Sequence, residues 1–122
     1  DRYFVRRFED ESNRHFHILI DASGSMAFNS GKAHWSKFDC AATIAVALAH
    51  INQRNNDATG FSFRTKEQLH WIDVSRTMES ISRAMELLQA TQPNGISDIA
   101  GDLNDADARL SRRSILIVLS DL

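Results

Sequence analysis

An apolar run that leads directly into an acidic, serine-rich turn constrains the fold most. Residues 16–20 read F-H-I-L-I, and the aromatic and β-branched bias of this run favours a buried strand over a helix. Asp21 follows at once, and Ser23 and Ser25 come after it at alternate positions. Gly24 allows a tight turn, which can bring the three oxygen-bearing side chains around one point. Such a group of oxygen atoms is typical of a site for a hard cation.

The rest of the chain alternates predicted strands and helices. Strands are predicted at 58–63, 69–74 and 114–120, and helices at 35–52, from a cap at Ser75 or Thr77 to Ala90, and at 98–110. The turn between the strands at 58–63 and 69–74 is too short for a parallel crossover, so these strands are expected to be antiparallel neighbours. A further strand is predicted at 2–9. This order predicts an α/β fold with three layers, a doubly wound, mostly parallel sheet and an antiparallel edge hairpin.

The predicted helices carry most of the expected core. Ser36 and Asp39 form a capping-box-like start for the helix at 35–52, whose body is apolar on nearly all sides. We therefore expect this helix to be buried all round, with Cys40 on a buried face. In the next helix, the residues at helical spacing are expected in the core; they are Met78, Ile81, Met85 and Leu88.

Composition excludes several classes of protein. The 122 residues are 43% hydrophobic and 25% charged, with a formal charge of −2, which fits one soluble globular domain without a nucleic-acid-binding patch. The longest apolar stretch, 40–49, is shorter than the roughly 20 residues that span a bilayer. The single cysteine excludes an internal disulfide and fits a reducing compartment.

A second acid lies at a matching position. Asp121 follows the predicted strand at 114–120, as Asp21 follows the first one. Doubly wound sheets bind ligands beyond the carboxyl ends of neighbouring strands where the strand order reverses. If these two strands are neighbours, both carboxylates share one crevice with the hydroxyls of Ser23 and Ser25. An all-oxygen set of this kind favours Mg²⁺ or Mn²⁺ over Zn²⁺ or Cu²⁺.

The D-A-S-G-S sequence at 21–25 resembles the metal-ion-dependent adhesion site (MIDAS) of von Willebrand factor type A (vWA) domains. The segment R-Y-F-V-R-R-F-E-D-E at 2–11 resembles the start of a bacterial branch, the DUF58 family. The resemblance places Ser97, within N-G-I-S-D-I, where these domains carry a metal-binding threonine. Serine keeps the hydroxyl but lacks the methyl group that fixes its rotamer, and Asp98 is the alternative, acting through water. The implied metal ligands are Asp21, Ser23, Ser25, Ser97 and Asp121.

The resemblance also implies an organisation and a function. Residues 1–122 would form a single Rossmann-like vWA domain, with residues 1–11 as a strand from an upstream region and with the C-terminal βα units missing. Such a truncated domain is expected either to self-associate through the edge of the strand at 114–120 or to have lost a longer part of its chain. The implied role is a non-enzymatic, metal-dependent protein-protein interaction module that binds an acidic side chain of its partner. Relatives are often encoded with MoxR-type AAA ATPases, which makes such an ATPase the implied partner, in assembly or metal insertion. We expect a cytoplasmic protein, associated with a membrane only through regions outside this chain.

Other functions fit the sequence less well. A Mg-dependent phosphoryl-transfer enzyme with a D-x-D motif would need an acid at position 23, where this chain has serine. A P-loop fails on its glycine spacing, and a serine hydrolase would need G-x-S-x-G. A structural domain without metal is the remaining alternative. His15 and His17 share a strand face, and a hydrogen-bonded role is favoured over metal binding; Trp35 and Trp71 are expected as core or interface anchors.

Overall fold

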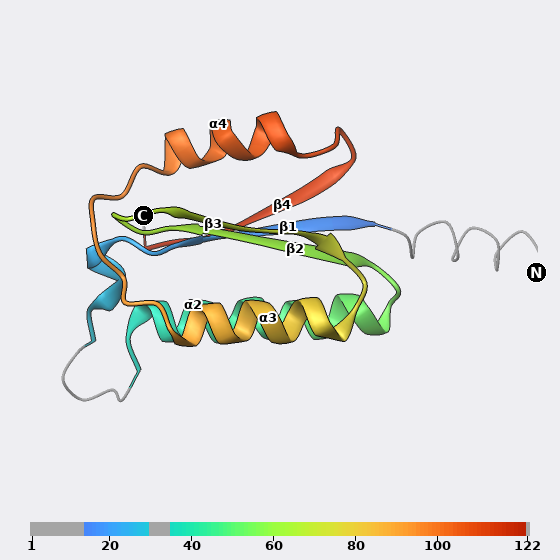
Figure 1. The fold of residues 1–122 in the computed structure, drawn as a ribbon, viewed down its shortest axis with the longest axis horizontal. Helices are drawn as coiled ribbons and strands as arrows, with labels where there is room; N and C mark the ends of the chain where they lie inside the picture. The colour runs from blue at the N-terminus through green and yellow to red at the C-terminus, as the bar shows by residue number, and fades with distance from the viewer. Residues whose placement is uncertain (1–13, 30–34, 122) are drawn as a thin grey trace, which may run out of the picture.

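In a computed structural model, which describes residues 14–29 and 35–121, the chain forms a four-stranded sheet between two helical layers. The elements in chain order are β1 (His15–Asp21), the 3₁₀ turn η1 (Gly24–Ala27), α2 (Lys37–Arg54), β2 (Ala58–Arg64), β3 (Leu69–Ser75), α3 (Met78–Gln89), α4 (Ile99–Arg109) and β4 (Ser114–Leu119). Figure 1 shows α2 and α3 on one face of the sheet and α4 on the other. The predicted three-layer α/β fold is confirmed, and the strand predicted at 2–9 lies outside the described residues.

The sheet has the order β3-β2-β1-β4. β1 lies in the middle and pairs in parallel with β2 and with β4. β2 and β3 pair antiparallel, with Arg64 opposite Leu69 across a short turn. The edge hairpin and the mostly parallel sheet are therefore as predicted.

Side-chain caps define the helix starts. At α2 the hydroxyl of Ser36 accepts a hydrogen bond from the backbone N–H of Asp39, and the Asp39 carboxylate accepts one from the N–H of Ser36, which confirms the capping box. Of the two predicted caps for α3, it is Thr77 that accepts the N–H of Ser80. Asp98 caps α4 by accepting the N–H of Gly101.

The main core lies between the sheet and the α2/α3 layer. Its large members are Ile18, Ile20, Phe38, Phe61, Phe63, Ile72, Ile81 and Leu88. Small residues of α2, Ala41, Ala45 and Ala49, allow the helix to lie close to the sheet. This layer holds β1 rigidly, and with it the turn that follows β1.

Two sequence predictions about the core are wrong. The helix α2 is not buried all round, because it packs through its alanine face and leaves Cys40, Ile44 and Ile51 exposed on the other side. Met78, the first residue of α3, is 46% exposed, because it lies at the N-terminal end of the apolar stripe; Ile81 and Leu88 are buried, and Met85 is only half-buried.

His17 belongs to the central strand β1, and its side chain lies on the face of the sheet that α4 covers. It is fully buried, its Nε2 is 2.8 Å from Oγ of Ser62, and its ring stacks on Trp71 with 4.3 Å between centroids. Its Nδ1 has no hydrogen-bond partner and lies beside Gly60, where a Cβ atom would come within 3.0 Å of it. Burial lowers the pKa of His17 to about 4, against the opposing effect of Asp73. The predicted hydrogen-bonded role of His17 is confirmed.

Candidate metal centre

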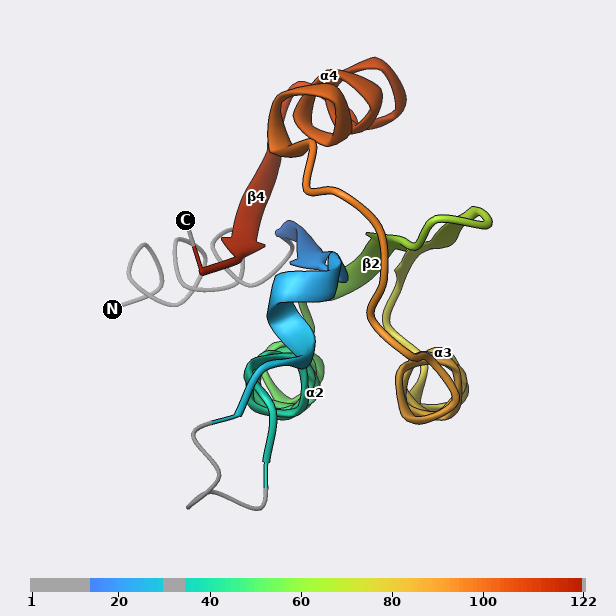
Figure 2. The same ribbon diagram turned by 90° about the vertical axis from the view of Figure 1, so that its left-hand side faces the viewer.

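The carboxyl ends of β1 and β4 meet at one edge of the sheet, because the two strands are parallel neighbours. β1 leads into η1 and α2 on one face, while α4, on the opposite face, precedes β4. Figure 2 looks at this edge and shows the segment between α3 and α4 crossing beside it from one face to the other. The strand order therefore reverses between β1 and β4, which is where open α/β sheets bind ligands.

Asp21, the last residue of β1, is the buried acid of this edge, with 4% of its surface exposed. Its Oδ1 accepts a hydrogen bond from the backbone N–H of Ser23 at 3.0 Å. Its Oδ2 accepts hydrogen bonds from the hydroxyls of Ser120 at 2.7 Å and Ser97 at 3.2 Å. Burial raises the pKa of Asp21, but these hydrogen bonds, led by that of Ser120, outweigh burial and hold the pKa below its ordinary value. Asp21 is thus a carboxylate at neutral pH.

Ser23 and Ser25 connect this acid to the next strand end. Their hydroxyl oxygens lie 3.2 Å apart across the start of η1. The hydroxyl of Ser25 donates to Oδ1 of Asp121 at 3.4 Å. Ser23 is buried and Ser25 is exposed, so this hydroxyl pair runs from the protein interior to the surface.

The segment between α3 and α4 is tied to the turn after β1. The N–H of Asn94 donates to the carbonyl oxygen of Ala22, and the N–H of Gly24 donates to that of Gly95, both at 2.9 Å. Gly95 has a φ of 88°, a conformation that favours glycine over residues with a side chain. These bonds bring Ser97 to the carboxylate of Asp21.

Asp121 lies two residues beyond the end of β4 and forms an ion pair with Lys37. Nζ of Lys37, the first residue of α2, lies 3.0 Å from Oδ2 of Asp121. The same ammonium lies 5.4 Å from the centre of the Phe28 ring.

The structure brings the five sequence-predicted ligands to one edge of the sheet, where hydrogen bonds link Asp21 to Ser97 and Ser25 to both Ser23 and Asp121. Within residues 14–29 and 35–121, no three His, Cys, Asp or Glu side chains form a metal-binding group, so an ion here would depend on two acids, hydroxyls and water. Such an oxygen set fits Mg²⁺ or Mn²⁺, which retain waters, and does not fit Zn²⁺. The predicted alternative ligand, Asp98, instead caps α4.

Sequence reasoning missed two residues of this centre, Ser120 and Lys37. Ser120 stands next to Asp121, and its hydroxyl reaches the acid of the neighbouring strand. This contact depends on the pairing of β1 with β4, which the order of the elements along the chain does not specify. Lys37 had no sequence signal beyond its place at the start of α2.

A hollow of about 590 Å³ opens beside the centre. Asp21, Ser23 and Ser97 line one end, and Arg64 and Lys66 line another part. Arg64 is held by two acids of α4, Asp102 at 3.0 Å and Asp105 at 2.7 Å.

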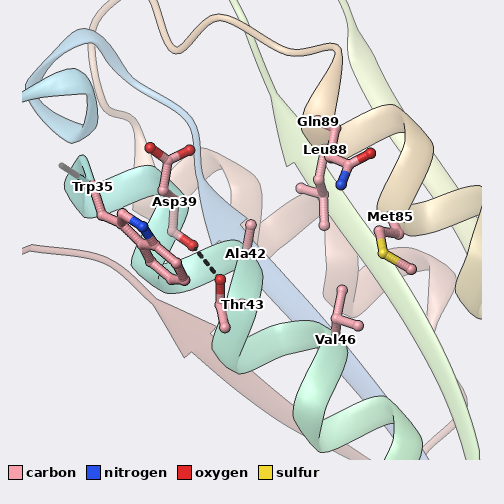
Figure 3. Close-up of a pocket in the computed structure, with 8 residues that line it drawn as sticks. All are labelled: Trp35, Asp39, Ala42, Thr43, Val46, Met85, Leu88 and Gln89. Carbon is pink, nitrogen blue, oxygen red and sulfur yellow. Dashed lines mark hydrogen bonds between the residues drawn. The ribbon is translucent and has the colours of Figure 1, made fainter.

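A second hollow, of about 460 Å³, lies between α2 and α3 (Figure 3). Its walls include the apolar residues Val46, Met85 and Leu88. Two of its polar residues serve α2 itself, since the hydroxyl of Thr43 donates to the carbonyl oxygen of Asp39, whose carboxylate caps the helix, and the amide of Gln89 on α3 stands apart from them. It therefore lacks the converging polar groups of a reactive site.

Two solved structures have a fold similar to that of this chain. The VWA domain of SpRpn10 matches with a TM-score of 0.60 and 16% identity, over 90% of this chain and 61% of that domain structure. An aerotolerance-related membrane protein from Bacteroides fragilis, with multiple mutations to serines, matches with a TM-score of 0.62 and 19% identity, over 87% of this chain and 53% of that one. The chain thus spans less than two thirds of either structure, and likeness at this level of identity establishes a vWA-like fold.

A comparison with curated proteins gave no significant match. The family described as "Protein of unknown function DUF58" matches residues 1–122, the whole length given. This chain belongs to the DUF58 family.

Proposed function

We propose that this domain is a metal-dependent protein-binding module. In this proposal Asp21, Ser23, Ser25, Ser97 and Asp121 hold one Mg²⁺ or Mn²⁺ ion. The observation that supports it most is that two acids, one of them buried, are linked at one edge of the sheet: the backbone N–H of Ser23 donates to Asp21, and the hydroxyl of Ser23 pairs with that of Ser25, which donates to Asp121. The ion, when bound, supplies an exchangeable coordination position for a carboxylate of the partner.

The chain's own residues prepare this site. The hydrogen bonds from Ser120, Ser23 and Ser97 keep Asp21 ionised in spite of its burial. The bonds from Asn94 to Ala22 and from Gly24 to Gly95 fix the Ser97 loop before any ligand arrives. Preformed ligands reduce the entropy that binding must overcome.

The surface beside the centre favours a protein as the partner. Ile96, next to Ser97, is 98% exposed although its loop is tied to the turn after β1. Phe28, just beyond η1, is 61% exposed. Exposed apolar side chains next to a polar centre are typical of protein interfaces, where they supply contact area around a specific polar contact.

Catalysis has less support. A serine–histidine pair exists, Ser62 with His17, but both residues are buried, 2% and 0% exposed, so a substrate cannot reach them. A phosphoryl-transfer reaction would need a second acid after Asp21, and the hydroxyl of Ser23 stands there instead.

The partner we propose is a MoxR-type AAA ATPase, acting with this domain in assembly or metal insertion, as the family resemblance implies. We further propose that regions outside this chain associate the protein with a membrane, since the Bacteroides fragilis structure is described as a membrane protein. None of the helices within the described ranges is long and apolar enough to cross a bilayer.

A binding assay with a purified MoxR-type ATPase from the same organism tests this function. We expect the ATPase to be retained by the immobilised domain in Mg²⁺ and released by EDTA. Ser23→Ala should abolish retention, whereas Ser82→Ala, an exposed position on α3, should leave it unchanged. Equal retention with Mg²⁺ and with EDTA would count against a metal-dependent module.

A further inference from the structure

The ammonium group of Lys37 is held against the candidate metal centre by its surroundings. Its Nζ lies 3.0 Å from Oδ2 of Asp121, while Oδ1 of the same carboxylate accepts the hydroxyl of Ser25. The backbone N–H of Lys37 donates to the carbonyl oxygen of Phe28 at 3.1 Å, and Nζ lies 5.4 Å from the centre of the Phe28 ring. The side chain of Lys37 is therefore anchored at Asp121 and its backbone at Phe28.

The position of this cation is otherwise unfavourable. Lys37 is the first residue of the 18-residue helix α2, where the positive end of the helix dipole repels a cation. The contact with Asp121 opposes that repulsion. Without an ion, the centre holds the two carboxylates of Asp21 and Asp121, and Lys37 partly neutralises this charge through its ion pair with Asp121.

We propose that Lys37 is an internal counter-ion that competes with a divalent metal for Asp121 and thereby sets the metal affinity of the centre. This inference rests on the function proposed above. A divalent ion that binds Asp121 must either displace the ammonium of Lys37 or bind while the ammonium stays in place. Either event lowers the affinity of the centre for the metal. Displaced from Asp121, the ammonium stays next to the centre through Phe28.

Coulomb's law gives the size of the effect. A unit charge and a double charge of the same sign, roughly 6 Å apart in a water-like dielectric, repel enough to weaken binding roughly tenfold. Water-like screening is appropriate because 46% of the Lys37 side chain is exposed.

Titration with Mg²⁺, followed by the shift in melting temperature and by calorimetry, tests this role. Lys37→Met removes the charge and keeps an apolar chain of similar length, and it should lower the Kd for Mg²⁺ roughly tenfold. Lys37→Arg keeps the charge and should bind Mg²⁺ as the unaltered protein does. Arg54→Met, at the opposite end of α2, changes the net charge equally and should leave the Kd within about twofold.

The outcomes separate this inference from the function on which it rests. If the unaltered chain binds Mg²⁺ and Lys37→Met binds it equally or more weakly, the counter-ion role is overturned while metal binding stands. If the unaltered chain does not bind Mg²⁺ at millimolar concentration, the proposed function fails first. Lys37→Gln serves as a second neutral variant, and melting curves in EDTA verify that each variant is folded.

Discussion

The hydroxyl of Ser120 donates a 2.7 Å hydrogen bond to Oδ2 of Asp21, across 99 positions of the sequence. The bond joins Asp21, the last residue of β1, to the residue that directly follows the neighbouring strand β4. It is also the strongest of the hydrogen-bond effects that lower the pKa of Asp21. The lowered pKa of the buried acid therefore depends in part on Ser120, the residue that follows β4.

Ser120→Ala should lower the free energy of unfolding by about 1–2 kcal/mol, because it removes a hydrogen bond to a buried carboxylate. Urea denaturation at pH 7 measures this loss. Ser82→Ala, at an exposed position of α3, should change it by less than about 0.5 kcal/mol. Equal effects of the two substitutions would mean that the Ser120 bond contributes nothing to stability.

Acid should destabilise the fold through His17. Its pKa falls from 6.5 in the unfolded chain to about 4 in the folded one, so the unfolded state binds more protons between these values. As far as His17 is concerned, the free energy of unfolding has its full value above pH 6.5. It decreases by about 3 kcal/mol in total as the pH falls toward 4. The check is the unfolding free energy at pH 7 and pH 4.5, which should differ much less in His17→Gln. A loss of the same size in that variant would assign the acid sensitivity to other groups.

Much of the fold follows from local sequence signals. The strand at β1 follows from a mostly apolar run with aromatic and β-branched residues, and the start of α2 follows from the Ser36–Asp39 capping box. The antiparallel pairing of β2 and β3 follows from the shortness of their connection. These features depend on neighbouring residues, which the sequence displays directly.

The incorrect predictions concern which of several similar faces of a helix packs against the sheet. α2 is apolar on nearly every side, so its sequence does not indicate which side packs on the sheet, and Ile44 and Ile51 prove to be exposed. Four of the candidate ligands were predicted because an acid comes at or just after the end of each of two strands, and Ser97 was predicted from the family resemblance. The contacts of Ser120 and Lys37 depend on strand and helix placement, which a single sequence does not encode locally.

The outer edge of β4 is expected to mediate self-association. β4 is the edge strand of the described sheet, and Ile115 and Val118 are 39% and 36% exposed. Uncovered apolar edge strands pair with other chains, and an edge lysine prevents it. Val118→Lys should therefore reduce association in sedimentation velocity, while Ser82→Lys should not. A chain that is monomeric over the whole accessible concentration range would refute this prediction.

Ile96 should contribute to partner binding without contributing to stability. Because its side chain is 98% exposed, Ile96→Ser should change the unfolding free energy by less than about 0.5 kcal/mol. Binding of the MoxR-type ATPase in Mg²⁺ should weaken by roughly tenfold, the loss typical of an apolar interface contact. Ile51→Ser, at an exposed isoleucine near the C-terminal end of α2, is the matched control and should bind normally. If both variants bind alike, the interface does not include Ile96.

Thermal unfolding with Mg²⁺ and with EDTA tests the central claim, that Asp21 and Asp121 share one divalent ion. At a metal concentration about 100-fold above Kd, ligand linkage predicts roughly 2.7 kcal/mol of added stability and a higher Tm. Asp21→Asn and Asp121→Asn should each abolish the increase, and Asp107→Asn, on the exposed side of α4, should retain it. An unchanged Tm in the unaltered protein, or a full increase in Asp21→Asn, would contradict the account.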